Sequence, residues 1–355
     1  MNDSLASLLA ALQADLLAFL RALDGVQQDI RFDDVGAAQR ALAASGTPAL
    51  ARAAARVADI TASEDADGNA LGDTLRAALD HLLTADAAFR RARDPAAFGA
   101  AFIGSRRHHC RALELLYRQR AALPLLESCF RLDDPLPGPD TGGGIRHVEA
   151  APGRAAYSLY VPEYYEPTRR WPLIVCLHGA FGHGEEYLWT WLRVARSRGY
   201  LLLAPKSAGP TWSILRPELD GAAILGALDE VLATCAVDPA RVHLSGLSDG
   251  GTFAWLLGLA HAERFAALAP IAGVLPPGAD GLLREGRGRE LPLHVVHGVH
   301  DTIFPVATIR STCALLERLG YALTYTELPD WGHALTERIN ENVLLPWFES
   351  LPAPA

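Results

Sequence analysis

A serine enclosed by glycines is the residue best placed to do chemistry in this chain. Ser248 is the centre of Gly246-Leu247-Ser248-Asp249-Gly250, which fits the pattern G-x-S-x-G. Apolar residues alternate before it and predict a short strand, and the apolar run after it predicts a buried helix. A serine on a sharp turn between a strand and a helix holds its hydroxyl above the sheet, and small neighbours let the two elements approach closely. The pattern therefore predicts that Ser248 is a nucleophile.

A base and an acid for this serine are expected further along the chain. A serine hydroxyl needs a base to take its proton, and an acid to orient that base. Asp301 follows a predicted strand at 291–298, and His333 follows another at 322–328. Both lie on loops after strands, where open α/β sheets place functional groups. We predict Ser248, His333 and Asp301 as nucleophile, base and acid.

Two neighbouring residues compete for these roles. His300 lies beside Asp301 and is the rival base, but adjacent residues point in different directions and seldom pair. Asp330 lies on the same loop as His333, three residues before it, and is the weaker alternative to Asp301.

The amides that would bind a developing oxyanion are expected from two places. One is the backbone N–H of Asp249, since the residue after the nucleophile donates to the oxyanion. The Asp249 carboxylate itself is interpreted as a complement to the positive end of the helix. The second donor should come from the glycine-rich loop after the predicted strand at 171–177. Ala180 is the preferred donor there, with Phe181 as the alternative.

Residues from about 145 to 350 resemble the α/β-hydrolase superfamily, and within it the phospholipase/carboxylesterase-like and polyhydroxybutyrate-depolymerase-like esterases. The motifs that carry the resemblance are Leu177-His178-Gly179, Gly246-Leu247-Ser248-Asp249-Gly250-Gly251, His297-Gly298-x-x-Asp301 and Gly332-His333. The resemblance implies a mostly parallel sheet flanked by helices. It also implies hydrolysis of acyl esters by a serine carboxylesterase through an acyl-enzyme, with no metal or organic cofactor.

The substrate is less well specified than the reaction, because one fold hosts many chemistries. Aromatic residues near the expected carboxyl ends of strands suggest an apolar pocket lined by Phe181, Trp189, Trp212 and Trp331, although large aromatics are often core residues. A small-molecule ester is the expected substrate. The same triad could cleave a thioester or a peptide bond, and a third reading is a binding protein on a hydrolase scaffold that has lost activity.

The first part of the chain has a different character. Leucines at three- and four-residue steps between Leu5 and Leu23 predict an amphipathic helix, and helical spacing returns around 73–90 and 98–123. A stretch rich in glycine and proline follows. We therefore predict an all-helical N-terminal domain at 1–132, a linker at 133–144 and the catalytic domain at 145–355. The helical domain could be a cap over the active site or a homodimer surface, although a leucine stripe is more often core.

Composition excludes several partner classes. A net charge of −9 argues against nucleic acid as a partner. No uninterrupted apolar run approaches the length of a membrane span, and the N-terminus does not read as a signal peptide.

The five cysteines are dispersed and odd in number, which favours reduced thiols in a cytoplasmic protein.

Overall fold

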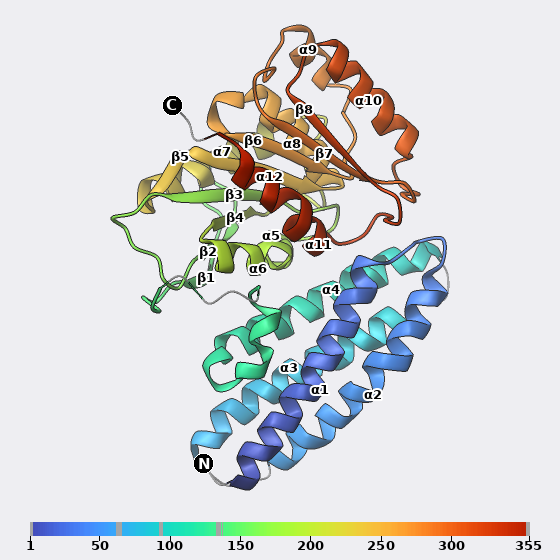
Figure 1. The fold of residues 1–355 in the computed structure, drawn as a ribbon, viewed down its shortest axis with the longest axis vertical. Helices are drawn as coiled ribbons and strands as arrows, with labels where there is room; N and C mark the ends of the chain where they lie inside the picture. The colour runs from blue at the N-terminus through green and yellow to red at the C-terminus, as the bar shows by residue number, and fades with distance from the viewer. Residues whose placement is uncertain (1–2, 62–65, 92–94, 133–135, 137, 353–355) are drawn as a thin grey trace. The chain divides into compact units, whose positions relative to one another are not determined.

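The chain forms two compact units, Met1–Asp133 and Asp134–Ala355. The computed structural model describes residues 3–61, 66–91, 95–132, 136 and 138–352 (Figure 1). The segment expected as a linker ends on Gly144, which is already the first residue of a strand. Most of the second unit is one sheet with its covering helices, so the predicted fold class, an α/β-hydrolase fold with an all-helical N-terminal region, is confirmed.

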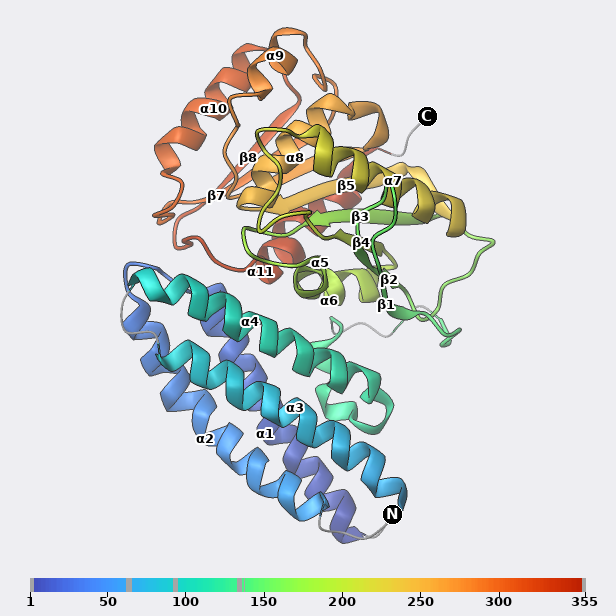
Figure 2. The same cartoon turned by 180° about the vertical axis from the view of Figure 1, so that it is seen from behind.

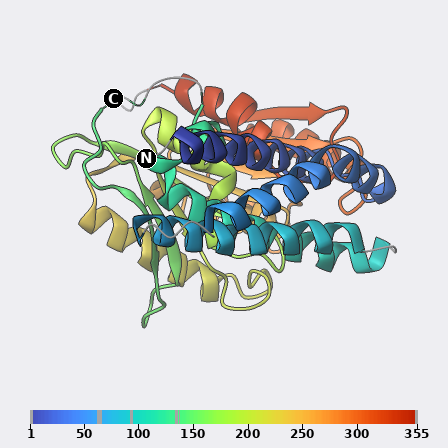
Figure 3. The same cartoon turned by 90° about the horizontal axis from the view of Figure 1, so that it is seen from below.

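The first unit is built of four long helices that lie side by side (Figure 3). They are α1 Asp3–Gln28, α2 Val35–Thr61, α3 Ala66–Arg91 and α4 Pro95–Arg118, followed by two short 3-10 helices, η1 Arg120–Ala122 and η2 Pro124–Cys129. Asp15 of α1 accepts hydrogen bonds from Arg52 and Arg56 of α2 at 2.7 and 2.8 Å, which ties the two helices together. The helices around 73–90 and 98–123 were predicted, and α2 is an additional one. Gly46 and Pro48 interrupt its sequence signal.

The leucine stripe of α1 belongs to a core. Leu12, Leu16 and Leu23 are at most 2% exposed, so a homodimer formed through the N-terminal helices would have to use another surface. By length and composition alone, Leu5–Gln28 is apolar enough to cross a membrane, which qualifies the sequence-based expectation of no span. A core helix of a soluble protein passes the same test, and part of this window is buried.

The second unit contains an eight-stranded sheet in the order β1-β2-β4-β3-β5-β6-β7-β8. The two pairs β1·β2 and β2·β4 are antiparallel, and every pair from β4 to β8 is parallel. The strands are β1 Gly144–Val148, β2 Tyr157–Val161, β3 Trp171–Leu177, β4 Leu201–Pro205, β5 Val237–Leu247, β6 Ala267–Ile271, β7 Leu293–Gly298 and β8 Leu323–Leu328. Strands β3, β4 and β6 are apolar and buried along their whole length, as expected for a parallel sheet with helices on both faces.

Helices cover the two faces of this sheet. One face carries α5, α6, α11 and α12, and the other carries α7, α8, α9 and α10 (Figures 1 and 2). Their bounds are α5 Gly184–Tyr187, α6 Trp189–Arg198, α7 Glu218–Thr234, α8 Asp249–Ala260, α9 Ala279–Arg284, α10 Val306–Arg318, α11 Glu337–Ile339 and α12 Leu345–Ser350. A π-helical turn, Asn340–Leu344, joins the last two, and a 3-10 turn, η3 Ala262–Arg264, follows α8. Because the strands from β3 to β8 run in one direction, the loops after β3, β5, β7 and β8 meet at the same edge of the sheet.

Candidate active site

Ser248 lies on a strained turn between β5 and α8. Its backbone angles are φ 58° and ψ −121°, in a region that bulkier side chains rarely adopt. The turn is fixed by the Ser248 N–H, which donates to the carbonyl of Ile271 at 2.9 Å, at the end of the neighbouring strand. Backbone strain of this kind persists only where the surroundings over-determine it, and it clusters at functional sites.

The glycines around Ser248 are required by close backbone contacts. A Cβ on Gly246 would lie 2.3 Å from the Gly250 carbonyl oxygen, and a Cβ on Gly250 would lie 2.3 Å from the Leu177 carbonyl oxygen. The first contact joins the two sides of the turn, and the second joins the start of α8 to the end of β3. The sequence pattern thus reflects a geometric need, since only glycine fits at either position.

His333 and Asp301 are paired beside this edge of the sheet. His333 Nδ1 lies 2.8 Å from Asp301 Oδ2, and the Asp301 side chain is completely buried. The other carboxylate oxygen accepts the backbone N–H groups of Ile303 and Phe304, each at 2.8 Å. Burial alone would raise the pKa of Asp301, but the hydrogen bond and charge of His333 and the two backbone donors hold it below the usual value. Asp301 is thus an ionised acceptor in a fixed orientation.

A second histidine supports the same turn. His297, at the end of β7, is fully buried, and its Nε2 lies 2.8 Å from the Phe304 carbonyl oxygen and 3.5 Å from Asp301 Oδ2. Burial lowers the pKa of His297, so the ring is neutral and its Nε2–H donates to the carbonyl. The sequence placed His297 at the end of a strand and in one of the motifs that carry the resemblance, but gave it no role of its own. The spacing His-Gly-x-x-Asp in that motif was the signal for its supporting role.

The rival residues make different contacts from Asp301 and His333. The carboxylate bound to His333 belongs to Asp301, whereas Asp330 is exposed. His300 donates its backbone N–H to the Trp331 carbonyl at 3.0 Å, and no side-chain hydrogen bond of His300 occurs within the part of the chain that the structure describes. Over the same residues no hydrogen bond joins Ser248 Oγ to His333. Such bonds are often long in unliganded sites and tighten with substrate.

The two candidate donors in the loop after β3 differ in whether their amide is free for an oxyanion. The Phe181 N–H donates to the Pro210 carbonyl at 2.7 Å, so it is not available. Ala180 N–H has no acceptor among the described residues, and neither has Asp249 N–H in the first turn of α8. A Cβ built on Gly179 would lie 3.4 Å from Ser248 Cβ, which places this loop against the nucleophile. The geometry favours Ala180 over Phe181 as donor.

The comparisons with known proteins find esterases and a thioesterase. No protein-family model matches the chain. A protein described as "probable feruloyl esterase C" from Aspergillus terreus is 24% identical over 176 residues, which are 47% of this chain and 61% of that protein. An acyl-protein thioesterase 1 from Gibberella zeae is 29% identical over 107 residues, 29% of this chain and 46% of that protein. A solved structure of a thermostable esterase has a TM-score of 0.47 at 22% identity, and the match covers 58% of this chain and 62% of that one.

The strand order and the serine on its strained turn after β5 agree with the fold that the sequence resemblance implies. The second unit has an α/β-hydrolase fold, and the sequence relatives include esterases. The chain spans about three fifths, 61%, of the feruloyl esterase it matches and less than half, 46%, of the thioesterase.

The aromatic residues expected to line a pocket in the α/β-hydrolase unit have different surroundings. Trp212 is 2% exposed, donates Nε1–H to the His178 carbonyl at 2.7 Å and stacks on the ring of Phe253 at 5.4 Å. Trp189 is also buried, at 6%. Both indoles are buried, and their place in a substrate pocket stays a prediction. Trp331 is half-buried, and Phe181 is 60% exposed.

Asp249 has a further contact that the sequence did not predict. Its carboxylate accepts the hydroxyl of Thr211 at 2.6 Å, which fastens the loop between β4 and α7 to the start of α8. The carboxylate thus does more than complement the helix end.

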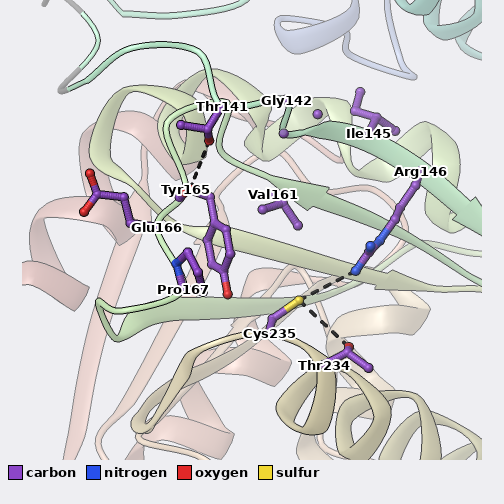
Figure 4. Close-up of a pocket in the computed structure, with 12 residues that line it drawn as sticks. Thr141, Gly142, Ile145, Arg146, Val161, Tyr165, Glu166, Pro167, Thr234 and Cys235 are labelled. Carbon is purple, nitrogen blue, oxygen red and sulfur yellow. Dashed lines mark hydrogen bonds between the residues drawn. The ribbon is translucent and has the colours of Figure 1, made fainter.

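A hollow of about 600 Å³ lies elsewhere in the unit (Figure 4). Its lining includes Arg146 of β1 and Cys235, whose side chains meet at 3.6 Å between Nη2 and Sγ. Cys235 precedes β5, whereas Ser248 follows it, so the hollow lies at the amino ends of the strands. None of the predicted site residues lines it.

Proposed function

We propose that this α/β-hydrolase unit hydrolyses carboxylic esters with Ser248 as the nucleophile. The observation that carries the proposal is the pairing of His333 Nδ1 with the buried Asp301 carboxylate at 2.8 Å, at the sheet edge where Ser248 sits on its strained turn. Esterases among the sequence relatives support the same reaction class.

In the proposed reaction, Ser248 Oγ attacks the ester carbonyl while His333 Nε2 takes its proton. The N–H groups of Ala180 and Asp249 donate to the oxyanion as it forms. Asp301 holds the His333 ring with Nδ1–H toward the carboxylate, so that Nε2 is the basic nitrogen. His333 then protonates the leaving alcohol, and water activated by the same ring releases the acid from the acyl-enzyme.

Labelling with a fluorophosphonate probe, together with hydrolysis of p-nitrophenyl acetate, tests the nucleophile. Ser248→Ala should abolish labelling and lower kcat/KM by several orders of magnitude. Ser245→Ala is a matched control, because that serine lies on the same strand with its hydroxyl bound to the Ala269 carbonyl at 2.9 Å. The control should label fully. Equal labelling of both variants would refute the assignment.

Thioester hydrolysis is the second candidate, because one relative is an acyl-protein thioesterase. Comparing kcat/KM on an oxygen ester, a thioester and an anilide that share one acyl group separates esterase, thioesterase and peptidase. A wild-type protein that neither labels nor turns over any of the three would instead favour a non-catalytic binding protein.

A further inference from the structure

Phe181 follows the proposed oxyanion donor and is the exposed aromatic residue of the described α/β-hydrolase unit. Its side chain is 60% exposed. Single exposed apolar residues are common on protein surfaces, so exposure alone carries no conclusion.

The backbone of Phe181 makes the exposure informative. Its φ is 59°, and a bulky residue in this region is a genuine outlier. The conformation is fixed by the bond from its N–H to the Pro210 carbonyl at 2.7 Å, which anchors the loop after β3 to the loop after β4. A glycine would adopt the same φ without strain and could make the same bond. The backbone therefore does not require phenylalanine here.

Packing does not require phenylalanine either, because the residue is mostly exposed. A strained aromatic that serves neither the backbone nor the core is explained by what it contacts outside the protein. Its place defines that contact. A Cβ built on Gly179, two residues before Phe181, would lie 3.4 Å from Ser248 Cβ.

The reaction geometry assigns the ring to one side of the substrate. The leaving alcohol must face His333, which protonates it. In the sheet, β3 lies on one side of β5, and β7 and β8 lie on the other. Phe181, on the loop after β3 and next to the proposed oxyanion donor Ala180, is therefore on the side of the nucleophile away from His333. The group next to Phe181 is then the acyl group, which stays on Ser248 in the acyl-enzyme.

We propose that Phe181 is a specificity-determining residue that binds the acyl group and selects esters whose acyl group is apolar and larger than acetyl. The proposal rests on the proposed esterase function. An exposed aromatic ring that is held rigidly can pack against an alkyl chain or an aryl ring at little cost in conformational entropy.

Ile303 provides a matched control. It is 50% exposed, and its N–H is fixed by Asp301 Oδ1 at 2.8 Å, so it is a second exposed apolar side chain beside a member of the triad. It lies on the acid side, toward the leaving alcohol. It should therefore not discriminate between acyl groups.

The test measures kcat/KM of the full-length chain on p-nitrophenyl acetate, hexanoate and benzoate. In Phe181→Ala the ratio of hexanoate to acetate, and of benzoate to acetate, should fall about three- to tenfold. In Ile303→Ala both ratios should stay within about twofold of the wild-type values. Phe181→Gly should lose the same preference and should have a higher Tm, because glycine adopts this φ without strain. If Phe181 had only a structural role, its replacement would lower the Tm instead.

The outcomes separate this inference from the proposed function. Unchanged ratios in both Phe181 variants, or an equal fall in Ile303→Ala, would overturn the role of Phe181 while esterase activity stands. A wild-type protein that hydrolyses none of the three esters would overturn the esterase proposal itself, and the acyl-binding role with it.

Discussion

The glycine after Asp249 offers a direct test of how the fold positions the nucleophile. Gly250 lies in the first turn of α8, where that helix touches the end of β3. We consider the substitution Gly250→Ala, which adds one methyl group and removes no hydrogen-bonding group.

The expected losses of stability and activity follow from the contacts of the added carbon. It would lie 2.3 Å from the carbonyl oxygen of Leu177 and 2.4 Å from that of His178, whereas ordinary contact begins near 3.4 Å. Both atoms are backbone, so α8 and β3 must part by about 1 Å. Overpacking of this kind costs about 1–3 kcal/mol, which in a domain of this size lowers the Tm by roughly 2–12 °C. A displacement of about 1 Å at the reacting atoms costs about a hundredfold in rate.

Calorimetry and p-nitrophenyl acetate hydrolysis, normalised by fluorophosphonate titration of active sites, measure both effects. Gly281→Ala is the matched control, because a Cβ there meets nothing within 4 Å and the position lies inside α9. It should stabilise the protein by about 0.5–1 kcal/mol and leave the rate unchanged. If Gly250→Ala keeps the wild-type Tm and activity, the close contact between α8 and β3 at the turn around Ser248 does not exist.

Three further predictions concern the triad, protonation and metals. Asp301→Asn should lower kcat about 10⁴-fold with the fold intact, because the amide would leave His333 in the wrong tautomer; a loss of less than tenfold in stopped assays would contradict the pairing. Burial lowers the pKa of His178 and His294 to about 4 and that of His243 to about 3. The unfolded chain then binds protons that the folded chain does not, so stability is fully present above about pH 6.5 and is lost as pH falls toward 4. Urea unfolding at pH 7.5 and 5 should differ by about 2 kcal/mol per histidine, and equal midpoints at the two pH values would contradict the neutral burial of these rings. Dialysis against a chelator should leave ester hydrolysis unchanged, since the proposed mechanism uses side chains and amides, and recovery of lost activity with a divalent ion would refute it.

The sequence was sufficient for the elements that depend on local pattern. The strand, turn and helix around Ser248 are encoded by an apolar alternation, small residues and an apolar run, and the structure has β5, the turn and α8 there. Asp301 and His333 were predictable because both follow strands that the sequence indicates, and parallel strands bring the loops at their carboxyl ends together.

Other features depend on contacts between segments far apart in the sequence. The choice between Ala180 and Phe181 as oxyanion donor depends on one hydrogen bond, from the Phe181 N–H to the carbonyl of Pro210, which lies in the loop after β4. The burial of Trp212 turns on its stacking against Phe253 of α8. An indole near a strand end has the same sequence signal whether it faces a pocket or the core, so the pattern did not distinguish the two.

Among the described residues, three that are not glycine have a strained backbone, and they show how the fold fixes the site before substrate binds. Phe181, Ser248 and Ala272 all have positive φ, and each follows a strand of the sheet. Each is held by a backbone hydrogen bond to a different segment, with Pro210, Ile271 and Val296 as the respective acceptors. The strain is therefore offset by the fold and not by bound ligand. None of these bonds uses the Ser248 hydroxyl, so Ser248→Ala should keep the turn between β5 and α8. Any loss of activity in that variant would then come from the missing nucleophile alone.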